Sequence, residues 1–406
     1  MQRSLLLAGL ATHVVAGALT LDVALELATL VRVRATMSET LARQPNYTCV
    51  QQIERSRRVL PKRKFELYDL LRIEVALVEG KEMFAWPGAR RFEKTDLTEM
   101  VSNGAIGTGD FALHARSVFQ TSAPVFKYAG TLKLRGHEAQ QFDFVVPLIS
   151  SGYHLKSGGR EAIVGYHGSF WADAHTAELV RLEVNADGIP PSLGIASVRD
   201  VMDYDHVRIG SSEFLLPIGS DLAMTDLAGN ESRNRTQFKG CRQYSGESVL
   251  SFAEAPEDEP AGPKPKTSVE VPDGMTLDIR LNTDIDSSSS AVGDPVSATL
   301  EYPVKKKHQV LFYKGAVLLG RILRLEQHPD YATIDLEFSE IESEDSRSTV
   351  LARLEELMLP VPSQPTRSTL LEVQGRTQVG SGIHIRGGKI HLPHGTRLRL
   401  RTMASN

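Results

Sequence analysis

Along most of this chain, apolar and polar residues alternate with a period of two. Ile73, Val75 and Leu77 alternate with polar or small neighbours, and from residue 275 to 281 the alternation is strict. Because successive side chains of a β-strand point to opposite faces, this pattern gives each strand one buried and one solvated face. Such strands are typical of antiparallel sheets, so the chain is predicted to be mainly β.

A proline-rich, charged segment interrupts the pattern. Residues 253–268 contain four prolines, charges of both signs and almost nothing that a core could bury. This composition favours an extended, solvated connector. We therefore expect two domains of ordinary size, at residues 19–252 and 269–406, joined by a linker at 253–268.

The first domain is predicted to be α+β, with a helix followed by a sheet. Apolar residues recur at helical spacings until Pro45 ends the pattern; they are Val23, Leu27, Leu30, Met37 and Leu41. Strand-like alternation follows and is repeated at residues 142–146 and 180–184. One helix on a large antiparallel sheet that curls around a cavity or a core accounts for this order.

Residues 1–18 have the pattern of a secretory signal peptide. A basic start precedes an apolar run at residues 5–15, and the small residues 16–18 complete a cleavage pattern. We expect cleavage near Ala18 and a periplasmic or secreted protein. The alternative is an uncleaved membrane anchor over residues 4–21, although Thr12 and His13 dilute its apolar character.

The chain contains two cysteines, Cys49 and Cys241. An exported protein with an even number of cysteines usually pairs them, so we predict one disulfide. Closing so long a loop stabilises a fold by roughly 5 kcal/mol in the chain-entropy model. Two buried free thiols are the alternative.

Charge and glycine spacing argue against nucleic-acid and nucleotide partners. The formal net charge is −4, and the basic segment at residues 55–64 has no interleaved aromatic residues, so we interpret it as a solvated hairpin loop. Residues 103–111 contain three glycines but lack the Gly-Lys-Ser/Thr ending of a phosphate loop. We expect these glycines to form turns in a loop that could gate a cavity mouth.

No sequence pattern predicts catalysis, a metal site or a cofactor. The chain lacks a Gly-x-Ser-x-Gly elbow, and His167 and Ser169 are neighbours within a strand pattern. His384, His391 and His394 cluster without an interleaved carboxylate or cysteine, which favours exposed histidines over ligands. We therefore expect a protein that is not an enzyme.

Two motifs in the first domain resemble a known family. Residues 168–173, Gly-Ser-Phe-Trp-Ala-Asp, lead into Glu-Leu-Val-Arg-Leu-Glu at 178–183, and Asn-Tyr-Thr-Cys at 46–49 precedes Glu-Arg at 54–55. Over residues 22–250 this order resembles the periplasmic lipoprotein-carrier (LolA-type) family and its relatives, including the sigma-regulator lipid-sensing domain. The resemblance implies an open β half-barrel that shelters an acyl chain or a lipid-modified segment.

Aromatic residues in the expected strands are candidates for lining such a cavity. The ligand-binding candidates are Phe84, Trp86, Phe142, Phe144 and Trp171. Alternation places Phe84 with Trp86 on one face and Phe142 with Phe144 on one face, whereas Phe170 and Trp171 must point to opposite sides. Ordinary packing in a filled core is the alternative for all of them.

The second domain resembles the periplasmic barrel of TrbI-type secretion-channel proteins. The matching segments are residues 281–287, 292–298 and 311–316, within a resemblance that covers about residues 271–402. It implies a small β-barrel or sandwich and a contact with an envelope protein through residues 269–406. A loop rich in proline and serine is expected at 360–369.

Two functions remain open at this point. The first is an exported, non-enzymatic protein that carries or senses a lipid, an acyl chain or a lipidated protein, for which burial of methylenes supplies the affinity. The second is a structural or interaction module of the envelope with a filled core and no small ligand. A hydrolase would require an ordered Ser-His-carboxylate geometry.

Overall fold

The computed structural model describes residues 9–89, 92, 97–101, 104–157, 159–244, 267–268, 271–344, 346–358 and 382–404. Side chains are described from residue 24 onward, except those of Glu99, Thr267 and Ser268. Residues 1–8 of the expected signal peptide, nearly all of the expected linker and the expected loop at 360–369 lie outside these ranges.

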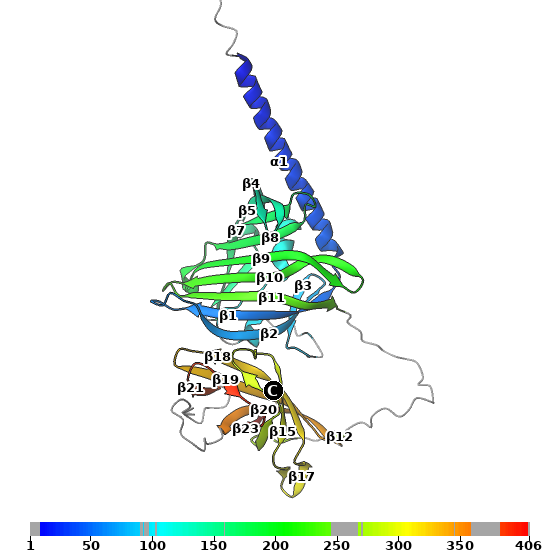
Figure 1. Ribbon diagram of the computed structural model, residues 1–406, viewed down its shortest axis with the longest axis vertical. Helices are drawn as coiled ribbons and strands as arrows, with labels where there is room; N and C mark the ends of the chain where they lie inside the picture. The colour runs from blue at the N-terminus through cyan, green and yellow to red at the C-terminus, as the bar shows by residue number, and fades with distance from the viewer. Residues whose placement is uncertain are drawn as a thin grey trace, which may run out of the picture.

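The first element is one long helix, α1 (Gly9–Arg43), which includes the predicted helix and ends before Pro45. Its last turns lie against the sheet, where Val33, Met37 and Leu41 are buried at a spacing of four. The predicted apolar face was wrong at Leu27, which is 61% exposed. The reason is that the helix extends beyond the sheet that its last turns contact (Figure 1). No described helix is both long and apolar enough to cross a membrane.

Eleven strands form the sheet of the first domain, in the order β3-β2-β1-β11-β10-β9-β8-β7-β5-β4, with β6 paired to β7. All described pairings in this sheet are antiparallel. The strands are β1 (Tyr47–Arg58), β2 (Glu66–Val78), β3 (Lys81–Ala85), β4 (Val125–Leu134), β5 (His137–Val146), β6 (Tyr153–Ser157), β7 (Arg160–Asp173), β8 (Leu179–Asp187), β9 (Ile195–Ile209), β10 (Ser212–Asp226) and β11 (Glu231–Gln243).

The first and last strands of this sheet are hydrogen-bonded neighbours. β1 pairs with β11, and the predicted disulfide between Cys49 and Cys241 joins them across a register shift in that pairing. The bond closes a sequence separation of 192 residues. The disulfide prediction is therefore confirmed, and the bond joins the first strand of the domain in sequence to the last.

The second domain has the strands β12 (Thr267–Ser268), β13 (Thr276–Leu281), β14 (Ile285–Asp286), β15 (Pro295–Leu300), β16 (Val304–Lys306), β17 (Gln309–Phe312), β18 (Val317–Gln327), β19 (Tyr331–Glu342), β20 (Ser346–Met358), β21 (Ile383–Arg386), β22 (His391–Leu392) and β23 (Arg397–Met403). The order β20-β23-β13-β15-β18-β19, with a further pairing of β19 to β20, closes these six strands into a small barrel.

The barrel interior follows the alternation in the sequence. Leu277, Ile279 and Leu281 of β13 are buried, whereas the polar residues between them lie at the surface or are half-buried. The prediction of a mainly β chain, with a helix on a curved antiparallel sheet followed by a small barrel, is therefore confirmed.

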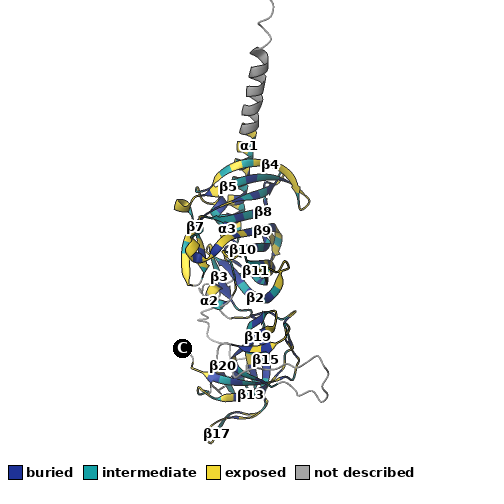
Figure 2. Cartoon of the chain, turned by 90° about the vertical axis from the view of Figure 1, so that its left-hand side faces the viewer, coloured by how far each residue is buried: buried dark blue, intermediate teal, exposed yellow. Residues whose placement is uncertain are grey.

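The two domains contact each other along the edge of the first sheet. Beyond the end of β3, the free edge of β2 pairs with the turn before β15: the Arg72 N–H donates to the Val292 carbonyl, and the Val292 N–H donates to the Leu70 carbonyl, both at 2.8 Å. Figure 1 shows β18 and β19 of the barrel lying beneath β1 and β2. Buried apolar residues of both domains form one continuous cluster across this junction. Figure 2 shows buried stretches of backbone in both domains, above and below the junction.

Candidate functional site

The predicted cavity residues lie in three different places. Phe142 and Phe144 are buried on the inner face of the sheet, where Phe142 stacks on Phe170 with ring centres 5.2 Å apart. Trp171 points to the opposite face, as the alternation predicts, and its indole N–H donates to the Gln141 side chain at 3.2 Å.

The other two predicted residues lie toward the second domain. Phe84 is buried in the cluster that crosses the junction, and Trp86 packs against that cluster from the end of β3. The Arg321 guanidinium of the barrel lies 5.5 Å from the centre of the Trp86 ring. The sheet therefore does not bring the five residues together, and none of them lines the cleft at Arg55 and His328 or the pocket at Asp203 and Asp221.

A segment of the first domain covers the inner face of the sheet. This cover segment, residues 97–101 and 104–119, contains the short helices α2 (Leu97–Met100) and α3 (Leu113–Phe119). Between them Phe111 is buried against Tyr47 and Phe238, with ring centres 4.8 and 5.2 Å away. Together with the last turns of α1, the cover segment closes the interior that the lipoprotein-carrier resemblance implies to be open.

The expected glycine loop is part of this cover segment. Gly104 and Gly109 have positive φ angles of 79° and 100°, as turns built on glycine require. The Ala105 carbonyl accepts a hydrogen bond from the Asn234 side chain at 3.0 Å, which holds the loop against β11. The loop therefore lies on the sheet face.

A carboxylate holds the cover segment in place. Glu82 of β3 accepts hydrogen bonds from the backbone N–H groups of Gly109, Ala112 and Leu113, at 2.9, 2.9 and 3.3 Å. The residue is half-exposed, but its carboxylate lies beneath the loop. Burial, together with the neighbouring Asp110, raises the pKa of Glu82 to about 7.

Further ionisable groups are buried beneath the loop. Asp110 accepts a hydrogen bond from the Ser220 hydroxyl at 2.5 Å, and burial raises the pKa of Asp110 to about 6. The His114 Nε2 lies 3.8 Å from an Asp200 oxygen, and burial lowers the pKa of His114 to about 4. Burial also raises the pKa of Asp200 well above its usual range.

These groups do not form a nucleophile and its base. The Ser220 hydroxyl donates to a carboxylate, whereas an activated serine donates to an imidazole. His167 and Ser169, which are close in the sequence, do not contact each other either. His167 contacts Asp187 at 2.8 Å, while the Ser169 hydroxyl donates to Asp143 at 2.6 Å. Neither group of residues has the geometry of a Ser-His-carboxylate triad.

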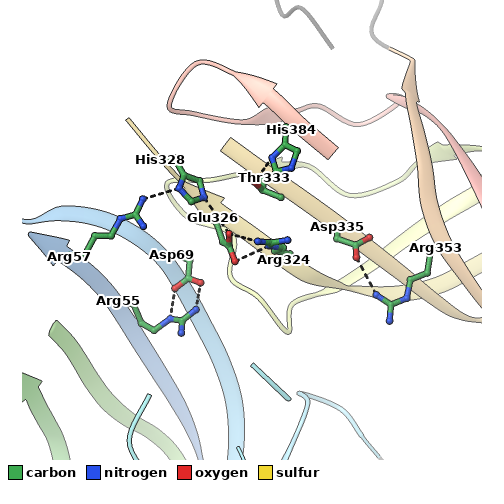
Figure 3. A network of polar contacts seen from close by, with 10 residues as sticks. All are labelled: Arg55, Arg57, Asp69, Arg324, Glu326, His328, Thr333, Asp335, Arg353 and His384. Carbon is green, nitrogen blue, oxygen red and sulfur yellow. Dashed lines mark hydrogen bonds and ion pairs between the residues drawn. The ribbon is translucent and has the colours of Figure 1, made fainter. Parts of the chain in front are cut away.

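A cleft of about 350 Å³, with several charged and polar residues in its lining, lies between the two domains. Its lining residues come from β1, β2, the cover segment, β11 and the barrel: Arg55, Ser56, Arg57, Tyr68, Gly104, Ala105, Ser232, Asn234, Arg324, Glu326 and His328. Figure 3 shows the central contacts of this cleft, with groups of both domains pointing toward one another.

Two arginines of the cleft are engaged by buried carboxylates. Arg55 makes two hydrogen bonds to Asp69, and both side chains are almost fully buried. Burial raises the pKa of Asp69, and the Arg55 charge opposes that effect. In the barrel, Arg324 pairs with the buried Glu326 at 2.8 Å.

The third arginine reaches across the junction. Arg57 donates to the His328 Nδ1 at 2.8 Å, so that nitrogen carries no proton and the other ring nitrogen donates to Glu326 at 3.3 Å. Burial and the Arg57 charge lower the pKa of His328, which keeps the ring neutral. The guanidinium carbons of Arg55 and Arg57 lie 5.1 and 4.9 Å from the centre of the Tyr68 ring.

The interpretation of residues 55–64 as a solvated loop was wrong for its first part. β1 continues to Arg58, and Arg55 is only 3% exposed. The signal was present in the sequence, because Arg55 has the same parity as the buried Gln51 and Ile53. Its partner, Asp69, is on the neighbouring strand and could not be identified without the register.

The three barrel histidines do not converge on a common point. His384 contacts the Thr333 hydroxyl, His391 pairs with Asp286, and the His394 backbone N–H donates to Asp284. Within the described ranges, no group of three histidine, cysteine or acidic side chains is placed to hold a metal ion.

No protein-family model matches the sequence, and no curated protein is similar to it at a significant level. Solved structures match about half of the chain. They include a LolA superfamily protein from Nitrosomonas europaea (10% identity, TM-score 0.28, covering 52% of this chain and 94% of that one). A domain named for outer membrane lipoprotein sorting, from Vibrio parahaemolyticus, is 12% identical with a TM-score of 0.29, covering 53% and 94%. A DUF1329 family protein from Desulfovibrio piger is 9% identical with a TM-score of 0.28, covering 54% and 94%.

Proposed function

We propose that this chain is an exported, non-enzymatic binding protein that holds an acyl chain or a lipidated segment against the inner face of its first sheet. The observation that carries the proposal is the cover segment. It closes an apolar, aromatic-rich face with two helices of only four and seven residues. We further propose that the barrel, residues 269–406, contacts a protein partner in the cell envelope.

Burial supplies the driving force in this proposal. A ligand must replace the cover segment on the sheet face, so its own burial has to offset the loss of contacts such as those of Phe111. Each buried methylene contributes about 0.8 kcal/mol, so a chain of about 14 methylenes contributes about 11 kcal/mol. That is of the same order as the burial of the large apolar side chains of the cover segment, at about 1.5–3 kcal/mol each.

The test is native mass spectrometry with lipid extraction on the chain from residue 19, incubated with vesicles of phosphatidylglycerol and phosphatidylethanolamine. We expect one acyl-bearing molecule per chain. Phe144→Asp, on the inner face, should abolish this binding. Val145→Asp is the matched control, because the next residue is 51% exposed and points to the other face.

Folding is monitored by circular dichroism. If Phe144→Asp fails to fold, Phe126→Ser replaces it, since that ring is half-buried at the rim of the same cluster. Equal lipid binding by inner-face and outer-face variants, or no binding by the unmodified chain, would reject the proposal.

The second candidate function is a structural or interaction module. The close stacking of Phe142 on Phe170, both at most 1% exposed, favours this candidate because a filled core leaves no room for a ligand unless the cover moves. Absence of lipid from the unmodified chain would support it.

A further inference from the structure

We propose that the cleft between the domains binds a phosphate group, either free or as part of a phosphate monoester or lipid headgroup. The cleft, of about 350 Å³, exceeds the size of the oxyanion itself and leaves space for a few attached atoms. Its lining comes from strands of both domains, so a bound group would contact both.

The charge balance of the cleft favours an anion. Three guanidinium groups, those of Arg55, Arg57 and Arg324, face two carboxylates, those of Asp69 and Glu326. Both carboxylates are buried in ion pairs, so they are not available to repel a ligand as free charges. The cleft therefore retains about one positive charge in excess.

Arg57 carries that excess charge. Among the described residues no carboxylate forms an ion pair with it, and its hydrogen-bond partner is the neutral His328 ring. A guanidinium has five N–H donors, and a single bond to an imidazole nitrogen leaves donors for an oxyanion. Charge-assisted bonds from arginine to phosphate are about twice as strong as neutral ones.

The directions of the donors favour phosphate over carboxylate. Arg57 lies on β1 and Ser232 on β11, while Arg324 comes from the barrel. A planar carboxylate is satisfied by one guanidinium fork, whereas a tetrahedral phosphate presents acceptor oxygens toward several strands at once. A phosphate group would therefore accept hydrogen bonds from more of the donors in the cleft than a carboxylate would.

The test is isothermal titration of the full chain with inorganic phosphate and, separately, with glycerol 3-phosphate; flotation with phosphatidylglycerol vesicles forms a third arm. Binding of the two soluble ligands identifies a free phosphate or monoester. Vesicle binding alone identifies a lipid headgroup only if Arg57→Gln weakens it, because acyl-chain binding on the first sheet does not depend on Arg57. We expect Arg57→Gln to weaken binding in whichever arm is positive by about tenfold or more, and Arg57→Lys to weaken it less.

Arg58→Gln is the matched control. Arg58 is the next residue of the same strand, and it pairs with Glu231 and lies over the Phe65 ring instead of lining the cleft. The Arg58→Gln variant should bind the phosphate ligand with the same affinity as the unmodified chain. The proposal is overturned if no arm shows binding up to about 10 mM ligand, or if Arg57→Gln and Arg58→Gln bind equally while both fold.

Discussion

Replacing Gly293 with alanine should weaken the docking of the two domains without unfolding either of them. Gly293 follows Val292 in the turn that pairs with β2, and its φ angle is +95°. A Cβ atom at this position would lie 2.3 Å from the Arg72 carbonyl oxygen and 2.7 Å from the Trp86 ring. The backbone of β2 and the turn therefore cannot keep their present spacing in Gly293→Ala.

Two contributions have to be separated. A residue with a Cβ atom in the left-handed region costs about 1–2 kcal/mol, and this cost lowers the stability of the barrel whether or not the domains are docked. Moving the turn away from β2 breaks the two hydrogen bonds between Val292 and the strand, each worth about 1 kcal/mol net. The ion pair between Arg72 and Asp294, which contributes up to about 1 kcal/mol, is lost with them. We therefore expect docking to weaken by about 3 kcal/mol, which is about a hundredfold.

Gly315→Ala separates these contributions. Gly315 has the same φ angle of +95°, but no atom lies within 4 Å of the position of its Cβ. In Gly315→Ala the strained backbone should lower the stability of the barrel, but the docking of the two domains should not change.

The assay is hydrogen exchange followed by mass spectrometry, with attention to the amides of Arg72 and Val292. Their exchange should accelerate about a hundredfold in Gly293→Ala, while the amide of Ile279 inside the barrel stays protected. Equal protection of both junction amides in Gly293→Ala and Gly315→Ala would refute the reasoning, because it would mean that the turn does not hold the domains together.

Three further predictions concern the first domain. Reducing the disulfide, or replacing Cys49 and Cys241 together with alanine, should lower the free energy of unfolding by up to roughly 5 kcal/mol, measured as a lower melting temperature; an unchanged temperature contradicts this. Because the pKa of Glu82 is raised from 4.5 to about 7 in the folded state, its contribution to stability is present below pH 4.5 and lost as the pH rises through 7. Measured by urea unfolding, the free energy of unfolding should therefore fall less between pH 4.5 and pH 7.5 in Glu82→Gln than in the unmodified chain. An equal fall in both would exclude this role of Glu82. Phe170→Ala should destabilise the fold by about 3–5 kcal/mol and Trp171→Ala by much less, in chemical denaturation; similar values would mean that the two faces are wrongly assigned.

Local periodicity predicted which faces of the strands are buried. Ile73, Val75 and Leu77 are all buried, as are the alternate residues of β13 in the barrel. Phe170 and Trp171 lie on opposite faces as expected. These features follow from the two-residue repeat of a strand, which depends on nothing distant in the sequence.

What covers each face could not be predicted in the same way. Phe84 and Trp86 were expected beside a cavity, but they pack at the junction with the barrel. Phe111 of the cover segment likewise packs on Phe238, which is far from it in the sequence. Periodicity determines the side of a strand on which a residue lies, but only the register and the tertiary contacts determine what it meets there.

The cleft and the turn before β15 that contains Val292 and Gly293, here called the docking turn, both involve β2. Phosphate binding and domain docking are therefore thermodynamically coupled. Arg72 and Tyr68 are both on β2, the first pairing with the docking turn and the second lining the cleft. If phosphate contacts Arg57 on one side and Arg324 on the other, it binds the docked arrangement better than the undocked one. Coupling between two equilibria is reciprocal, so the factor by which phosphate protects the Val292 amide must equal the factor by which undocking weakens phosphate. Gly293→Ala, although distant in sequence from Arg57, should therefore weaken phosphate binding in titration, and Gly315→Ala should not. An affinity that is unchanged in Gly293→Ala would show that the phosphate contacts the first domain alone.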